Sequence, residues 1–104
     1  MHSEYVFAYR ITIENKTDDT IQLLNRQWFI FDSIGENSEV TGEGVIGNQP
    51  TLEPEELHQY VSGCHLKSEI GKMHGIYEFL NKGDGSTFKV SIPEFKLIAP
   101  LKLN

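Results

Sequence analysis

The sequence has 104 residues, a net charge of -6 and a single cysteine, Cys64. This length suits one domain, so we expect residues 1–104 to fold as a unit. An acidic chain with scattered Lys and Arg repels phosphates and anionic lipids, which predicts no nucleic-acid and no membrane partner. The first residues lack the basic and apolar segments of a signal peptide, so we expect none, and no apolar run approaches the roughly 20 residues that span a bilayer. With no disulfide possible, we predict a cytoplasmic location.

The first two regular segments are predicted to be strands. Residues 5–14 alternate strictly, with aromatic and β-branched side chains on one face and mostly polar ones on the other, which is typical of a half-buried strand. Residues 21–32 form a second run, in which Trp28, Phe29, Ile30 and Phe31 are consecutive and apolar. This run favours a central strand covered by protein on both faces, or a bulge that reassigns the faces.

Further short strands follow, separated by turns rich in Gly and Asn. No window shows an apolar stripe at helical spacing with caps at both ends, so no long helix is expected. The pattern therefore predicts an all-β fold, either a two-sheet sandwich or a small barrel. The remaining strands are expected at residues 39–41, 58–62, 73–80, 88–92 and, at a sheet edge, 95–98.

Several segments together resemble the bacterial ApaG family, also called CorD, in order and spacing. They are residues 5–15, 24–28, 42–50, 62–64, 71–77 and 92–95. The resemblance implies a fibronectin-III-like or immunoglobulin-like β-sandwich of two antiparallel sheets. It also implies an association with cobalt resistance and magnesium efflux. Related domains in eukaryotic F-box proteins and in a polymerase-interacting protein look like protein-binding modules, and the family brings no established catalytic residues.

The sequence departs from the family pattern at two places. Members usually begin with an extra strand before the segment that resembles residues 5–15, whereas here four residues precede Tyr5. We expect that an N-terminal stretch is absent from this sequence, because loss of the strand from the protein would expose a flat sheet edge. Gln27 stands where the family is associated with His, so histidine chemistry is not expected there.

Residues 42–47 spell the glycine pattern G-x-G-x-x-G. In a Rossmann fold these glycines open a helix that holds a pyrophosphate. Here Pro50 disfavours helical geometry at Gln49, and Glu43 would repel a phosphate, so a Rossmann nucleotide site is not expected. Two interpretations stay open. The glycines let the chain cross between sheets or pack on its own core, or successive amides bind pyrophosphate or a nucleotide as a nest.

We expect a non-catalytic binding or protein-interaction module, whose partner this loop contacts. The glycines would shape the backbone, Gln49 would offer its amide, and exposed apolar side chains would supply contact. The alternative is small-molecule binding of pyrophosphate or a nucleotide at the same loop. No cofactor is expected. The predicted site comprises Gly42, Gly44, Val45, Ile46, Gly47, Gln49 and Pro50.

Other chemistry-bearing residues favour structural interpretations. The histidines have no metal-ligand spacing, so no metal site is expected. Cys64 lacks a base that can reach it and is expected to be a structural thiol. The acidic residues at positions 53, 55 and 56 are expected on a solvated surface. Arg26 and Trp28 share one strand face, and Trp28 is expected in the sandwich core.

Overall fold

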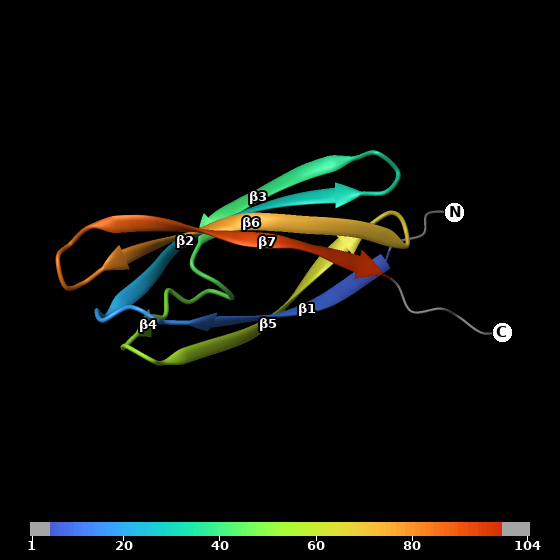
Figure 1. Cartoon of the computed structure of the whole chain (residues 1–104). Helices are drawn as coiled ribbons and strands as arrows, with labels where there is room; N and C mark the ends of the chain where they lie inside the picture. Colours follow the sequence, from blue (N-terminus) through green and yellow to red (C-terminus); the bar gives the residue numbers. More distant parts are fainter. Residues whose placement is uncertain (1–4, 99–104) are drawn as a thin grey trace.

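Residues 5–98 of the computed structural model form seven β-strands (Figure 1). These residues contain no α-helix, and therefore none that is long and apolar enough to cross a membrane. The strands are β1 (Tyr5–Glu14), β2 (Ile21–Asp32), β3 (Asn37–Glu43), β4 (Thr51–Leu52), β5 (Leu57–Leu66), β6 (Ile70–Asn81) and β7 (Thr87–Ile98).

The strands pair into two antiparallel sheets. β1 and β5 form one sheet, and the other has the order β3-β2-β6-β7, with β4 joined to the start of β2. The two layers lie one over the other in Figure 1, with β1 and β5 below the larger sheet. The predicted β-sandwich of two antiparallel sheets is therefore confirmed.

The alternation along β1 and the bounds of β2 are confirmed. Of the two explanations of the apolar run in β2, cover by protein on both faces is wrong, and the bulge that reassigns the faces is confirmed. Trp28 and Ile30 face the core, whereas Phe29 and Phe31 lie half-buried on the outer face of the sheet, which residues 5–98 leave open. The register shift between Leu23 and Asn25 changes which positions face inward, since Ile21 and Leu23 are buried before it and Trp28 after it, so the predicted bulge does reassign the faces.

The later strands are longer than expected. β6 begins before residue 73, and β7 joins the segments predicted at 88–92 and 95–98 into one strand. β3 extends beyond 39–41 in both directions, and β5 continues past 62 to Leu66. In this continuation Cys64 and Leu66 remain on the buried face, so the alternation that begins at Tyr60 does not stop at Gly63. The short strand β4 has no counterpart among the predicted elements.

A groove of about 350 Å³ lies between the edges of β1 and β7, with Ile11, Ile13, Phe88 and Ile92 among its lining residues. Among residues 5–98, β1 pairs with β5 alone. The expected extra strand would precede Tyr5, outside the described residues, and stays a prediction.

The core is organised around Trp28, which is 3% exposed. Its ring centroid lies 5.8 Å from Tyr9 of the facing sheet, 6.1 Å from Tyr77 and 5.8 Å from Phe95. Gly75 of β6 lies directly beside the indole, since a Cβ at this position would come within 2.8 Å of Trp28 Cε3. The missing side chain at Gly75 thus makes room for the central residue of the sandwich.

A buried carboxylate joins two turns at the far end of β2. Asp32 is 6% exposed and accepts hydrogen bonds from the amide of Lys67 (2.7 Å), the amide of Ile34 (3.4 Å) and the hydroxyl of Ser68. Burial alone would raise the pKa of Asp32, but these hydrogen bonds outweigh it and hold the pKa below its usual value. The ionised carboxylate therefore ties the β2–β3 turn to the β5–β6 turn.

We predict that Gly75→Ala lowers the free energy of unfolding by about 2 kcal/mol, because the new methyl group would overlap the Gln27 carbonyl oxygen and overpack the core at Trp28. Gly63→Ala is the matched control. Its Cβ would meet one atom, the Phe7 carbonyl oxygen at 3.6 Å, which is ordinary contact. Urea unfolding of both variants measures the difference, and an equal effect of the two substitutions would contradict this account of the core.

Asp32 also predicts how stability depends on pH. A carboxylate whose pKa is lowered by folding stabilises the protein above its unfolded pKa of about 3.9, and this contribution is lost as the pH falls through the folded pKa. We expect Asp32→Asn to cost about 1–3 kcal/mol at neutral pH. The gap between wild type and variant should close below about pH 3.9. Urea unfolding between neutral and acidic pH tests this, and a gap that persists unchanged in acid would refute it.

Candidate functional site

The glycine loop, residues 42–50, connects the end of β3 to β4 and passes between the two layers of the sandwich (Figure 1). Its centre is a tight turn. The amide of Val45 donates to the carbonyl of Asn48 (2.7 Å) and the amide of Asn48 donates back (2.9 Å). Ile46 and Gly47 between them have φ angles of 48° and 72°, which is the signature of a type I′ turn. As predicted, no helix begins at Gly47.

The loop is attached to the bulge in β2. Leu24 falls at the register shift, and its carbonyl accepts hydrogen bonds from the Gly44 amide (2.8 Å) and the Gln49 side-chain amide (2.9 Å). The neighbouring Leu23 amide donates to the Pro50 carbonyl (3.0 Å). The bulge therefore supplies the polar groups that hold both ends of the loop.

The Arg26 side chain supports the loop through hydrogen bonds to its backbone. Its Nη1 donates to the carbonyl oxygens of Glu43 (3.1 Å) and Gly44 (2.9 Å). The guanidinium lies against Gly42, where a Cβ would come within 2.8 Å of Nη1. Gly44 is more constrained, because its φ is +59° and a Cβ there would overlap the Asn48 carbonyl oxygen. Gly44 is thus required by its backbone contacts, whereas a side chain at Gly42 would displace the Arg26 guanidinium from the loop.

The predicted site residues divide into an internal and an external group. Val45 is 1% exposed and belongs to the core, so it lacks the exposure on which its expected apolar contact depended. The Gln49 side-chain amide donates to the Leu24 carbonyl, and the Pro50 carbonyl accepts a hydrogen bond from the Leu23 amide. Ile46 is 56% exposed at the tip of the turn. The interpretation in which the loop packs on its own core describes all of these residues except Ile46 and Gly47.

The backbone amides bear on the anion alternative. A nest needs successive amides that point at one ligand. The amides of Gly44, Val45 and Asn48 already donate to carbonyls of this protein. Few loop amides are therefore left to bind a pyrophosphate or nucleotide, and this hypothesis stays a prediction.

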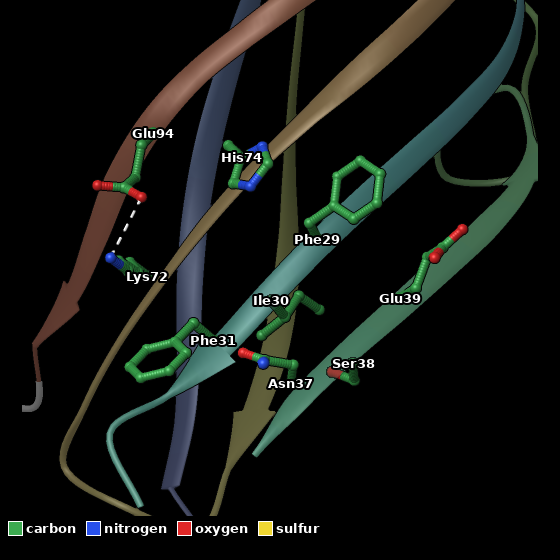
Figure 2. Close-up of a pocket in the computed structure, with 9 residues that line it drawn as sticks. All are labelled: Phe29, Ile30, Phe31, Asn37, Ser38, Glu39, Lys72, His74 and Glu94. Atoms are coloured by element: carbon green, nitrogen blue, oxygen red, sulfur yellow. Dashed lines mark ion pairs between the residues drawn. The ribbon is translucent and has the colours of Figure 1, made fainter. Parts of the chain in front are cut away.

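A second concave surface lies on the outer face of the larger sheet, and Figure 2 shows its lining side chains. It encloses about 520 Å³. Phe29 stacks on His74 at 5.0 Å between ring centroids, with 21° between the planes. Lys72 Nζ lies 5.2 Å from the centroid of Phe31 and 3.5 Å from Glu94. We call this surface the aromatic trough.

The sequence interpretation missed the aromatic trough, although a signal was present. Four consecutive apolar residues in a strand must send two side chains to each face. Nothing in the pattern tells whether the second face is covered by protein or left open. Phe29 and Phe31 are on the open side.

The remaining candidates occupy structural positions. Trp28 is in the core and Cys64 is buried, as predicted. Burial, with the negative charge of Asp32 as a smaller cause, raises the pKa of the Cys64 thiol and so disfavours a thiolate. Within the part of the chain that the structure describes, no three His, Cys, Asp or Glu side chains are grouped to hold a metal ion.

These features define a β-sandwich domain whose glycine motif forms an intersheet loop instead of a helix start. Comparison with known proteins agrees. The family model of the ApaG domain matches residues 1–81. Protein ApaG of Mesorhizobium japonicum is 47% identical over 98 residues, which cover 94% of this chain and 75% of that protein. Protein ApaG of Brucella anthropi is 49% identical with the same coverage. The chain belongs to the ApaG family.

Solved structures show the same fold. An X-ray structure of a Northeast Structural Genomics Consortium target superimposes with a TM-score of 0.92 at 38% identity, covering 99% of this chain and 79% of that one. A crystal structure of a protein described as ApaA from Bordetella pertussis gives a TM-score of 0.89 at 41% identity, with 95% and 80% covered.

We predict that Gly44→Ala and Gly47→Ala differ sharply in cost. Gly44→Ala combines a left-handed backbone with overlap of the Asn48 carbonyl and should lower the free energy of unfolding by at least about 3 kcal/mol. Gly47 has a φ of +72°, but a methyl group at this position would meet no atom within 4 Å, so its substitution should cost about 1 kcal/mol. Thermal and urea unfolding measure both values. Equal costs would show that the loop does not rest on the support described above.

Proposed function

We propose that this chain is a non-catalytic protein-interaction module that contacts its partner through the tip of the glycine loop. The observation that carries the proposal is Ile46. A β-branched residue at a φ of 48° is an outlier, and left-handed geometry costs such a residue about 1–2 kcal/mol. Asn or Gly would relieve this cost in a type I′ turn.

Ile46 gains little from burial that could offset the strain, because the residue is 56% exposed. Strained residues persist where the surroundings hold them and are concentrated at sites of function. The hydrogen bonds from the β2 bulge and from Arg26 fix the turn, so the side chain is presented in one position. A rigid apolar anchor of this kind binds a partner with little loss of conformational entropy.

The absence of catalysis is part of the same proposal. Cys64 is buried with a raised pKa, and its Sγ lies 3.9 Å from the His65 carbonyl, not beside a base. The Ser68 hydroxyl contacts the Asp32 carboxylate, but the lowered pKa of Asp32 makes this carboxylate a weak base. We propose that any effect on cobalt resistance or magnesium efflux runs through a protein partner in the cytoplasm.

The test is affinity capture from the lysate of the source bacterium, quantified by mass spectrometry. Ile46→Asn should raise the free energy of unfolding by about 1 kcal/mol, because Asn tolerates positive φ. The same variant should reduce partner retention by about tenfold or more, the loss of a contact worth at least about 1.4 kcal/mol. Opposite effects on stability and binding cannot arise from unfolding.

Ile34→Asn is the matched control, because Ile34 is 54% exposed in a different turn, between β2 and β3. It should leave partner retention unchanged. A partner that binds the Ile46→Asn protein as well as wild type would remove the loop tip from the proposal.

A further inference from the structure

A small cavity of about 130 Å³ lies between the sheets beneath the glycine loop. Its walls include the rings of Tyr9, Trp28 and Tyr60, and its polar lining includes Arg26 and Ser62. The turn at residues 45–47 forms the remaining side. The cavity shares no lining residue with the aromatic trough on the outer face, so the two are separate.

Arg26 brings a positive charge to this cavity. It is half-buried, and both protons of Nη1 are engaged by the carbonyls of Glu43 and Gly44. Among residues 5–98, no carboxylate forms an ion pair with Arg26, and Nε and Nη2 have no hydrogen-bond acceptor. The described residues have no buried side-chain nitrogen that lacks a partner, so Nε and Nη2 stay accessible to a ligand, and the planar fork of guanidinium donors matches an oxyanion.

The two buried tyrosines provide a further donor. The hydroxyls of Tyr60 and Tyr77 share a short hydrogen bond across the two sheets. Burial, the largest cause, raises the pKa of both groups, and the charge of Arg26 only partly opposes this, so both stay protonated at neutral pH. The pair then has two protons and one internal hydrogen bond. If Tyr77 donates to Tyr60, the Tyr60 proton remains for an acceptor in the cavity.

We propose that this cavity is a binding site for one small oxyanion, a carboxylate or a phosphate group, held by Arg26 Nη2 and Nε and by the Tyr60 hydroxyl. At about 30 Å³ per water molecule, the cavity holds the equivalent of about four waters, enough for such a group but not for a nucleoside. The site differs from a nest of loop amides, since its donors are side chains of β2 and β5. It does not depend on a protein partner at Ile46.

The experiment is an NMR titration of the ¹⁵N-labelled protein with sodium acetate and, separately, with sodium phosphate, with sodium chloride keeping the ionic strength constant. We expect saturable shifts of the Arg26 Nε–H, the Trp28 indole N–H and the amides of residues 44–47 at millimolar anion. The two anions distinguish a site for planar carboxylates from one for tetrahedral phosphate. A response to neither anion would overturn the proposal.

Variants assign the donors. Arg26→Gln should weaken binding by about tenfold or more, since a hydrogen bond to a charged group is worth about 1.5–3 kcal/mol. Because Arg26 also supports the loop, Tyr60→Phe provides an independent test that keeps the ring in place, and it should weaken binding by about fivefold. Arg10→Gln is the matched control, since Arg10 is exposed on the outer face of β1. Equal binding by wild type and Tyr60→Phe, or equal weakening by Arg10→Gln, would refute the assignment.

Discussion

The packing of Trp28 between the two sheets is the interaction on which the other features depend. The indole contacts aromatic rings from three other strands, and Tyr9 among them belongs to the facing sheet. A residue at this position fixes which face of β2 is inward. Arg26 lies two residues earlier on the same face, so the orientation that buries the indole also brings a guanidinium between the sheets. The charge under the glycine loop is thus a consequence of the core.

The glycine loop supplies hydrogen-bond partners that this position of the guanidinium requires. A guanidinium at the end of the core needs acceptors, and the loop supplies the carbonyls of Glu43 and Gly44. The bulge at Leu24 leaves a carbonyl outside the β2–β6 ladder, and the loop satisfies this group in turn. The loop and β2 thus supply hydrogen-bond partners to each other's polar groups, as expected from the cost of leaving buried polar groups unpaired. Gly44 is needed because this fit brings the loop backbone against the Asn48 carbonyl, and Gly42 leaves room for the Arg26 guanidinium.

Sequence reasoning succeeded where one strand face is buried and the other is solvated. Residues 5–14 and 21–32 became strands with the predicted bounds, because a period of two is visible without knowledge of the partner strand. It failed where the outcome depends on tertiary context. The continuation of β5 past Gly63 was missed since a strand glycine normally weakens or bends a strand, whereas Gly63 is simply exposed here.

The structure of the glycine loop was likewise predicted only in part. Pro50 and the β-branched residues of the loop correctly indicated that no helix follows the glycines. The broken alternation of residues 21–32 indicated a bulge, but not that its carbonyl would bind the glycine loop, so the burial of Val45 and the internal bond of Gln49 could not be foreseen. The exposure of Phe29 and Phe31 likewise depends on what covers the outer face. Local patterns report the periodicity of a strand, but not the identity of the surface against which its second face lies.

The same arrangement explains why a strained residue can persist at the loop tip. Three independent supports, the bulge carbonyl, the Arg26 guanidinium and the paired bonds between Val45 and Asn48, fix the turn on either side of Ile46. Their combined strength exceeds the penalty of about 1–2 kcal/mol for left-handed geometry at one residue. The fold therefore separates two demands, since the glycines and Arg26 determine the shape of the loop while the residue at its tip can vary without loss of the core. A binding module benefits from this separation, because its contact residue can be selected for the partner and not for stability.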